Sequence, residues 1–328
     1  MELEERLARI DVEAAAERLL GVVKRTPLEA VPDVEAKDPR EEVRLKLECV
    51  QETGSFKARG AWNNVSQLTP AQREAGVIAT SSGNHGRALA WAARRAGVRA
   101  TIVMPADAYP NKIQACRDEE ADVVLAPSRA DAERICAERV SSGAVLIHPY
   151  DAERTVEGAG TVGLEIVDDW PDVEVLVVPV GGGGLIAGCA IAAKRRRKSI
   201  VVVGVEPAGA ASMTLGLAAG RSVILPEITT EVQGLCPLAS GELNVAIALD
   251  YVDHVITVDD DEVFEAQLVL AQANLTVEPA GAAACAAVRE RKLPPELFEG
   301  RSAKAPLRVA VVVSGGNPDP AQFARLVG

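Results

Sequence analysis

The sequence predicts an α/β fold built on two open sheets of parallel or mixed strands. Short runs of β-branched residues alternate with longer Ala-rich segments of helical periodicity, as in parallel sheets that are covered by helices. The chain has 328 residues, enough for about two domains. Glycine-rich or serine-rich loops follow several predicted strands, and open parallel sheets bind ligands at this end of their strands.

Composition and charge exclude several classes of function. Hydrophobic residues make up 48% of the chain and charged residues 25%, which is typical of a globular protein and not of a disordered one. The 35 Lys and Arg against 47 Asp and Glu give a net charge of −12, which repels polyanions. We therefore expect no nucleic-acid partner.

Two further features predict a cytoplasmic protein without a membrane partner. The apolar stretch at 176–193 is interrupted by Pro179 and by four glycines, so it predicts a strand, a loop and a helix. The N-terminal residues 1–20 have helical periodicity and lack the apolar core of a signal peptide. The six cysteines have no metal-binding spacing and are expected to be reduced core residues.

The predicted elements divide the chain into two units. A small α/β domain is expected over residues 65–147, and a larger, discontinuous domain over residues 1–64 and 148–328. The small domain contains strands at 77–80, 100–104, 123–125 and 145–147 and a helix through 89–95. The large domain contains helices at 157–167 and 186–194 and strands at 44–48, 175–178, 200–205, 254–258 and 307–313.

The four consecutive glycines at 181–184 follow a predicted strand and precede a helix. Residues without a Cβ let several backbone N–H groups converge at a helix N-terminus, where the helix dipole also favours an anion. The loop lacks the lysine of a Walker motif and the spaced glycines of a dinucleotide fingerprint. A phosphate site is therefore predicted, and a flexible turn is the alternative.

The loop Ser81-Ser82-Gly83-Asn84-His85 also lies between a predicted strand and a helix. Its hydroxyls, its amide and the free N–H groups of the helix start would suit a carboxylate or another anion. Ser and Asn also favour helix N-caps without any function, so a capping turn remains the alternative. A lone His at such a position is more often a surface or cap residue than a catalyst.

Lys57 and Ser314 complete the set of candidate residues. Lys57 would fall in the first turn of a helix, where the positive end of the dipole lowers the pKa of an amine, as a nucleophile requires. An ordinary surface lysine is the alternative. Ser314 follows the last strand and would face the same crevice as the glycine loop, unless it merely ends that strand.

Together these motifs resemble the fold-type II pyridoxal 5′-phosphate enzymes, whose fold is of the tryptophan synthase β type, and specifically the threonine dehydratase and serine racemase group. The resemblance covers nearly the whole chain. Its ordered segments are RTPL at 25–28, KLE at 46–48, GSFKARGA at 54–61, SSGNHG at 81–86, HP at 148–149, GGGG at 181–184, GVEP at 204–207, EPAGA at 278–282 and SGGN at 314–317.

The resemblance implies a role for each candidate residue. The amine of Lys57 would hold the aldehyde of pyridoxal 5′-phosphate as a Schiff base and would take the α-proton of the substrate. Ser82 would be the catalytic group on the opposite face of the cofactor ring. The residues implied in binding the cofactor are Phe56, Lys57, Asn84 at the ring hydroxyl, Gly181, Gly182, Gly183 and Gly184 at the phosphate, and Ser314 at the pyridine nitrogen. Those implied in binding the substrate carboxylate are Ser81, Ser82, Gly83, Asn84 and His85.

The reaction implied is the α,β-elimination of water from a hydroxy amino acid. L-Threonine or L-serine would give 2-oxobutanoate or pyruvate plus ammonia. The hydroxyl of Ser314 does not keep a proton on the ring nitrogen as an aspartate would, which favours prompt elimination over a long-lived carbanion. The resemblance also implies a homodimer and, without a further C-terminal regulatory domain, no feedback inhibition by isoleucine.

Three alternatives remain open at this point. The protein could be a racemase of serine or another amino acid, a 3-hydroxyaspartate ammonia-lyase, or a non-catalytic module that binds an anion or a nucleotide. The second is suggested by departures from the family pattern at Ala159, at residues 230–235 and at Arg87, which could favour an acidic substrate side chain.

The resemblance also raises the expectation of a bound divalent cation, Mg²⁺ or Ca²⁺. The racemase branch of the family uses the glutamate after Gly-Val together with an aspartate several residues later. Glu206 is the matching ligand here, whereas Ser212 stands in the neighbourhood of the aspartate.

Overall fold

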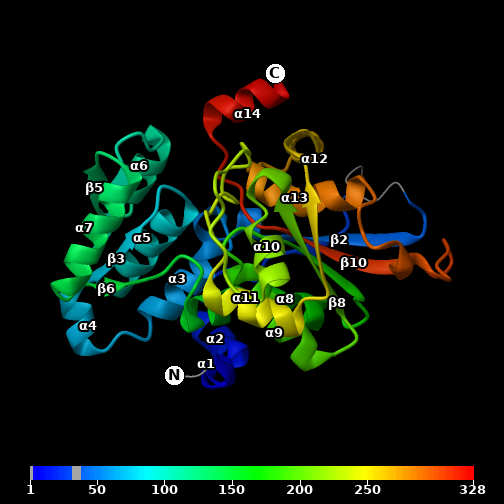
Figure 1. The fold of residues 1–328 in the computed structure, drawn as a ribbon, viewed down its shortest axis with the longest axis horizontal. Helices are drawn as coiled ribbons and strands as arrows, with labels where there is room; N and C mark the ends of the chain where they lie inside the picture. Colours follow the sequence, from blue (N-terminus) through cyan, green and yellow to red (C-terminus); the bar gives the residue numbers. More distant parts are fainter. Residues whose placement is uncertain (1–2, 32–37) are drawn as a thin grey trace.

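Two separate sheets form the framework of the molecule (Figure 1). The computed structural model describes residues 3–31 and 38–328. The first two residues of the predicted N-terminal helix and residues 32–37 of the predicted large domain lie outside this range. None of the described helices is both long and apolar enough to cross a bilayer.

The larger sheet has six strands in the order β1-β2-β10-β7-β8-β9. β1 runs antiparallel to β2, and the other neighbours are parallel, so the sheet is mixed as predicted. β2 pairs with β10 from Glu41 opposite Leu307 to Leu47 opposite Val313, which confirms that the N-terminal strand joins this sheet. The strands are β1 (Leu28–Glu29), β2 (Glu41–Leu47), β7 (Val175–Pro179), β8 (Val201–Pro207), β9 (His254–Val258) and β10 (Leu307–Val313).

Helices cover both faces of the larger sheet. Val175 and Val177 of β7 belong to the core shared with α12 (Asp260–Gln272) and α13 (Pro279–Arg289). Leu176 and Val178 belong to the core shared with α8 (Glu153–Asp169) and α9 (Gly184–Arg196). Alternate side chains of a strand point to opposite faces, so the continuous apolar runs of the sequence reflect burial on both sides.

The smaller sheet has four parallel strands in the order β5-β4-β3-β6. Val77 and Ala79 of β3 pack with α5 (Asn84–Ala96), and Ile78 packs on the other face with α7 (Arg129–Ser141). The strands are β3 (Val77–Thr80), β4 (Ala100–Pro105), β5 (Asp122–Ala126) and β6 (Val145–Leu146). The predicted α/β fold with two open sheets is thus confirmed.

Helix α3 (Lys57–Val65) connects the two sheets. Its residues Ala58, Ala61 and Val65 belong to the same core as β3 and α5. On its other side it packs against α8, where Gly60 approaches the backbone of Thr155. All strands of the smaller sheet lie within residues 77–146, and the strands of the larger sheet lie before and after this segment. The domain limits at 64/65 and 147/148 stay a prediction.

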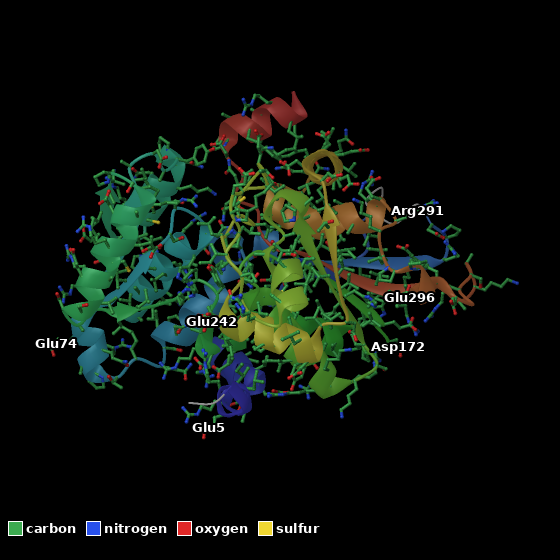
Figure 2. All side chains as sticks on the ribbon, in the orientation of Figure 1. Glu5, Glu74, Asp172, Glu242, Arg291 and Glu296 are labelled. Atoms are coloured by element: carbon green, nitrogen blue, oxygen red, sulfur yellow. The ribbon has the colours of Figure 1, made fainter. Side chains whose placement is uncertain are left out.

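The remaining elements and the charges lie mainly around this framework. The labelled acidic side chains Glu74, Asp172 and Glu242 are exposed, and Glu74 lies at the outer edge of the molecule in this view (Figure 2). All six cysteines are free, and all but Cys236 are buried, as predicted. The other helices are α1 (Leu3–Arg9), α2 (Val12–Leu19), α4 (Pro70–Ala75), α6 (Pro110–Arg117), α10 (Ser212–Ala219), α11 (Glu242–Tyr251), α14 (Pro320–Val327) and the short η1 (Glu48–Val50), η2 (Glu52–Gly54), η3 (Ala208–Ala210) and η4 (Pro295–Phe298).

Candidate active site

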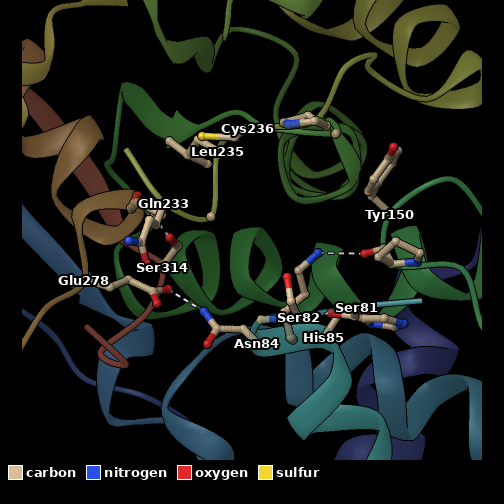
Figure 3. A pocket seen from close by; sticks show the side chains of 18 of the residues that line it. Ser81, Ser82, Asn84, His85, Tyr150, Gln233, Leu235, Cys236, Glu278 and Ser314 are labelled. Carbon is tan, nitrogen blue, oxygen red and sulfur yellow. Dashed lines mark hydrogen bonds between the residues drawn. The ribbon is translucent and has the colours of Figure 1, made fainter. Parts of the chain in front are cut away.

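A cavity of about 560 Å³ lies where the carboxyl ends of β3, β7 and β10 meet (Figure 3). Its position agrees with the rule that open parallel sheets bind ligands beyond the carboxyl ends of their strands. The structure brings all but one of the predicted site residues to this cavity. The predicted residues that line it are Phe56, Lys57, Ser81, Ser82, Gly83, Asn84, His85, Gly181, Gly182, Gly183, Gly184 and Ser314.

Lys57 is the first residue of α3 and extends its amine into the cavity. The chain reaches this helix through a tight turn in which Thr53 and Gly54 adopt positive φ angles of 59° and 73°. The Nζ atom donates a hydrogen bond to the carbonyl oxygen of Pro149 at 2.6 Å. Burial lowers the pKa of Lys57 to about 8, against the opposing attraction of Glu278. A substantial fraction of this amine is therefore neutral near physiological pH.

The glycine loop at 181–184 links β7 to α9. A Cβ on Gly182 would lie 2.2 Å from the ring carbon Cγ of Tyr150, and Gly183 has a φ of 90°, so both positions require glycine. The carbonyl oxygen of Gly182 accepts hydrogen bonds from the backbone N–H of Gly241 and from Asn244 Nδ2 at 3.0 and 2.7 Å. Since the C=O and N–H bonds of a trans peptide point in opposite directions, the N–H of Gly183 points away from Gly241 and Asn244.

The loop therefore offers both things that a phosphate ester needs. It presents backbone and no side chains to the cavity, and it lies at the start of α9, whose first N–H groups have no partner within the helix. The prediction of an anion-binding loop thus fits the geometry, because the backbone around Gly182 packs too closely for a merely flexible turn.

The serine loop at 81–86 links β3 to α5 and uses its side chains differently. Ser81 Oγ accepts hydrogen bonds from the backbone N–H groups of Gly86 at 3.0 Å and Gly83 at 3.3 Å. This hydroxyl thus holds the shape of the loop. Among the described residues, the hydroxyl of Ser82 has no hydrogen-bond partner, although it lines the cavity, so it is free to meet a ligand.

His85 is buried at the start of α5. Its Nε2 lies 2.8 Å from the carbonyl oxygen of Ile147. Because a carbonyl only accepts, Nε2 carries the proton in this contact. Burial, reinforced by the positive charge of Lys57, lowers the pKa of His85 to about 3, so the ring is neutral at physiological pH. The alternative that His85 is a surface residue is wrong, because its side chain is buried.

Asn84 contacts a residue to which the sequence analysis gave no role. Its Nδ2 donates to Oε1 of Glu278, a short hydrogen bond drawn as a dashed line in Figure 3, and its Oδ1 accepts from Asn317 Nδ2 at 2.9 Å. Burial raises the pKa of Glu278 to about 7, opposed by Lys112 and by the bond from Asn84. The one available sequence signal was an acidic residue directly before Pro279 at the start of an Ala-rich helix.

Ser314 lies at the end of β10 and is almost fully buried. Its hydroxyl donates to the carbonyl oxygen of Ala280 at 3.3 Å, which is a long hydrogen bond. A hydroxyl rotates freely, so this donor can turn towards a better acceptor in the cavity. Phe56 lines the same cavity, and its ring lies 4.9 Å from Lys57 Nζ.

The cavity wall includes Gln233, from the segment 230–235 whose departure from the family pattern was noted in the sequence, and other residues that were given no role. Gln233 Nε2 donates to the hydroxyl of Tyr109 at 2.9 Å, which joins the segment between α10 and α11 to the loop between β4 and α6. Tyr150 and Lys112 also line the cavity. No local motif marks these residues, because each reaches the cavity through long-range packing.

The structure corrects what was expected of Arg87 and Ala159, two positions that depart from the family pattern. Arg87 does not line the cavity: its Nη1 donates to Asn317 Oδ1 at 3.0 Å, behind the cavity wall. Ala159 is buried inside α8. Neither side chain can contact a substrate directly, so the argument for an acidic substrate through Arg87 loses its basis.

The predicted cation ligand Glu206 does not fit a metal site. It is fully buried at the end of β8, away from the cavity lining, and its carboxylate accepts hydrogen bonds from the N–H groups of Met213 and Thr214 at 2.7 and 2.9 Å. These donors belong to the positive end of α10, which repels a cation. Within the described residues, no three His, Cys, Asp or Glu side chains come together to hold a metal ion. We therefore withdraw Glu206 as a Mg²⁺ or Ca²⁺ ligand.

Comparison with known proteins decides the family. Residues 19–315 match the family model for pyridoxal-phosphate dependent enzymes. The chain belongs to this family. Its cofactor is pyridoxal 5′-phosphate, and the glycine loop at 181–184, which lines the cavity at the start of α9, fits the phosphate of such a group.

Similar family members carry two kinds of name. The chain is 38% identical over 320 residues to the L-threonine ammonia-lyase of Thermotoga maritima, covering 97% of this chain and 77% of that protein. It is 34% identical over 324 residues to the catabolic L-threonine dehydratase TdcB of Escherichia coli K12, covering 97% and 95%. A solved structure of maize serine racemase superposes with a TM-score of 0.88 at 33% identity, covering 96% of this chain and 94% of the other.

Proposed function

We propose that this protein is an ammonia-lyase that converts L-threonine to 2-oxobutanoate and ammonia, and L-serine to pyruvate and ammonia. The observation that carries the proposal is the shared cavity, in which Lys57 with its lowered pKa faces a glycine loop suited to phosphate and a serine loop suited to a carboxylate. The names of the ammonia-lyase and dehydratase relatives support this choice of reaction.

The cofactor would be held by residues of both sheets. The backbone N–H groups at 181–184 would bind the phosphate, Asn84 the ring hydroxyl, and Ser314 the ring nitrogen. Phe56 would line the ring pocket beside Lys57. When bound, pyridoxal phosphate supplies an electron sink for the charge that develops at the α-carbon of an amino acid.

The side chains of the chain would do the rest of the chemistry. The N-terminal end of α5 and the loop at 81–85 bind the substrate carboxylate, and the neutral ring of His85 keeps that wall uncharged. Nζ of Lys57 would remove the α-proton and pass a proton to the β-hydroxyl, which leaves as water. The released enamine tautomerises and hydrolyses to the 2-oxo acid and ammonia.

Amino-acid racemisation is the second candidate function. It is favoured by the hydroxyl of Ser82, which lines the cavity without a partner among the described residues, and by the similarity to maize serine racemase. A racemase needs a second proton donor besides Lys57. Replacing Ser82 by Ala should then abolish D-serine formation and leave pyruvate formation largely intact.

Membership of an enzyme family argues against the non-catalytic anion-binding or nucleotide-binding module. We further propose a cytoplasmic homodimer with a small-molecule substrate and no nucleic-acid or membrane partner. The acidic composition supports the absence of nucleic acid, since polyanions are repelled. Light scattering on the cofactor-loaded protein would measure the molecular mass and test the dimer.

The function is tested most simply at Lys57. We expect Lys57→Ala to remove both the absorbance band of the bound cofactor and the formation of 2-oxo acid, because no other amine replaces this one. Lys304→Ala, at an exposed position, serves as the matched control and should behave as the wild type. An active Lys57→Ala protein would refute the proposal.

A substrate screen decides among hydroxy amino acids. Ammonia release should be measured with L-serine, L-threonine and both 3-hydroxyaspartate diastereomers. We expect threonine and serine to be used at least about tenfold better than the acidic substrates, since the Arg87 side chain lies outside the cavity wall. The reverse order would identify a 3-hydroxyaspartate ammonia-lyase.

A further inference from the structure

Glu278 is a buried carboxyl group of the cavity that the proposed chemistry does not use. It occupies the N-cap position of α13 without a capping hydrogen bond from its side chain, and it lines the cavity. Its Oε1 approaches Gly315 so closely that a Cβ there would lie 2.1 Å away. The only side chain that donates a hydrogen bond to it within the described residues is Asn84, from α5, 194 residues away in sequence. The carboxyl group of Glu278 therefore links the segment before α13 to the start of α5, which belongs to the other sheet.

The surroundings of Asn84 fix which of its two amide atoms faces which neighbour. An ionised Glu278 only accepts, so it takes a hydrogen from Nδ2 of Asn84. On the other side, Asn317 Nδ2 donates to Oδ1 of Asn84 at 2.9 Å, and it also donates to the carbonyl oxygen of Thr53 at 2.8 Å. Nδ2 of Asn84 keeps a second hydrogen, which is free for an acceptor in the cavity.

We propose that Glu278 is a positioning residue that fixes the amide orientation of Asn84 and so keeps an Asn84 N–H group directed at the ring oxygen of the cofactor. This inference rests on the cofactor role of Asn84 in the proposed function. Without an ionised Glu278, the amide nitrogen of Asn84 loses its acceptor, and only the contact with Asn317 still distinguishes its nitrogen from its oxygen. A flipped amide would present Oδ1 to the cofactor oxygen, and the hydrogen bond would be lost.

The charged and titratable groups that face Glu278 come from three other elements. Lys112 of α6 and Lys57 of α3 both favour its ionised form, and the carboxylate in turn acts on the thiol of Cys49 in η1. Burial opposes ionisation more strongly and leaves the pKa of Glu278 at about 7. Above this pH the carboxylate orients Asn84, and below it a protonated carboxyl also donates and admits the flipped amide. The spectrum of the bound cofactor should therefore change across the neutral range.

Two substitutions separate position from charge. Glu278→Asp keeps a carboxylate at the helix cap but withdraws it from Asn84, so the dissociation constant of pyridoxal 5′-phosphate should rise about tenfold, as for a lost hydrogen bond to a charged group. Glu278→Gln keeps the length of the side chain but removes the group that titrates. The change in the cofactor spectrum around neutral pH should therefore disappear. Absorbance titrations measure both quantities.

Glu41→Gln is the matched control. Burial also raises the pKa of Glu41 to about 7, but this residue lies at the far end of β2, paired with Leu307, whereas Ser314 follows the opposite end of β10. We expect wild-type cofactor affinity and a wild-type pH response of the spectrum. Loss of the spectral change in Glu41→Gln would assign that change to something other than Glu278.

A double-mutant cycle with Asn84→Ala tests whether Glu278 acts through Asn84. We expect Glu278→Asp to change the cofactor affinity less than about twofold once Asn84 is absent, because coupled residues give non-additive effects. A full tenfold effect in the Asn84→Ala background would overturn the inference, and so would a spectral pH change that persists in Glu278→Gln. Thermal unfolding of each apo-protein verifies that the variants are folded.

These measurements need no substrate, so they separate the two proposals. If the predicted cycle is observed but threonine and serine are not converted, only the proposed reaction is wrong. If the wild type binds cofactor and converts threonine but the cycle is additive, only the role of Glu278 is wrong.

Discussion

The glycine loop at 181–184 and the serine loop at 81–86 occupy equivalent places in the two sheets. Each follows a parallel strand and opens a helix into the same cavity. At Gly182 a Cβ would meet the ring of Tyr150, and at Gly183 it would meet Asn244 and Met213. At Gly83 a Cβ would meet nothing within 4 Å. The glycine loop is therefore closely packed at Gly182 and Gly183, whereas the serine loop has open space at Gly83 and close packing only at Gly86, inside α5.

This difference in packing matches how long the ligand of each loop is proposed to stay bound. A cofactor phosphate stays bound through many turnovers, and a rigid backbone cradle binds it without ordering any side chain. A substrate carboxylate must enter and leave, and a free hydroxyl group such as that of Ser82 adapts to it. The same strand–loop–helix unit thus serves a permanent and an exchangeable ligand.

The largest predicted effect breaks the glycine loop. Gly182→Ala places a methyl group 2.2 Å from the Tyr150 ring, so the loop must move, and we expect cofactor affinity to fall by at least about 100-fold. Gly83→Ala, in the open loop, should change that affinity less than about tenfold. Dissociation constants from absorbance titration test the pair, and equal effects would contradict the contrast between the loops.

The amine between the two loops should make cofactor binding depend on pH. Only a neutral amine attacks an aldehyde, and burial lowers the pKa of Lys57 to about 8. The neutral fraction rises with pH through this value, so the cofactor band should form about 50-fold more slowly at pH 6 than at pH 8 and level off above it. Stopped-flow absorbance on apo-protein measures this, and a rate that is flat from pH 6 to 8 would argue against a lowered pKa.

A smaller effect is expected inside the serine loop. Ser81→Ala leaves the N–H groups of Gly83 and Gly86 without their acceptor, so the loop loses its shape and KM for threonine should rise about tenfold. Cofactor affinity should stay within about twofold of the wild type. Ser82→Ala leaves this backbone network intact and is the matched control for loop structure, read by thermal unfolding. An equal loss of cofactor affinity in Ser81→Ala would show that the loops are not independent.

The smallest predicted effect concerns the hydrogen bond between Gln233 and Tyr109 in the cavity wall. Tyr109→Phe removes the hydroxyl that accepts from Gln233 at 2.9 Å and keeps the ring. A neutral hydrogen bond of this kind contributes about 1 kcal/mol, so kcat/KM should change about fivefold or less, without a change in cofactor affinity. Steady-state kinetics with threonine measures the effect, and a loss above about 100-fold would give Tyr109 a direct role in the chemistry.

Local patterns predicted much of the fold and of the cavity. The strands at 77–80, 254–258 and 307–313 were predicted at their observed limits, because short apolar runs between turn residues mark buried strands. The two ligand loops were found because each lies directly after such a strand. The sequence also placed an N-terminal strand at 44–48 in the large domain, whereas β2 is observed at Glu41–Leu47 and its register against β10 was not predicted.

Long-range packing explains what the sequence did not reveal. Glu278 meets Asn84 across 194 residues, and no local spacing encodes that contact. The lowered pKa of Lys57 was attributed to its place at a helix start, whereas burial is the main cause. Glu206 looked like a cation ligand, but the N–H groups of α10 occupy its carboxylate. In each case the decisive neighbour comes from a distant segment.

The most direct test of the account asks which amine carries the cofactor. Lys57 and Lys112 both line the cavity, and burial lowers the pKa of both. Borohydride reduction of the cofactor-loaded protein, followed by proteolysis and mass spectrometry, traps the cofactor on the lysine that holds it. We predict a single modified peptide that carries the label on Lys57. A label on Lys112, or on no lysine at all, would contradict the central claim.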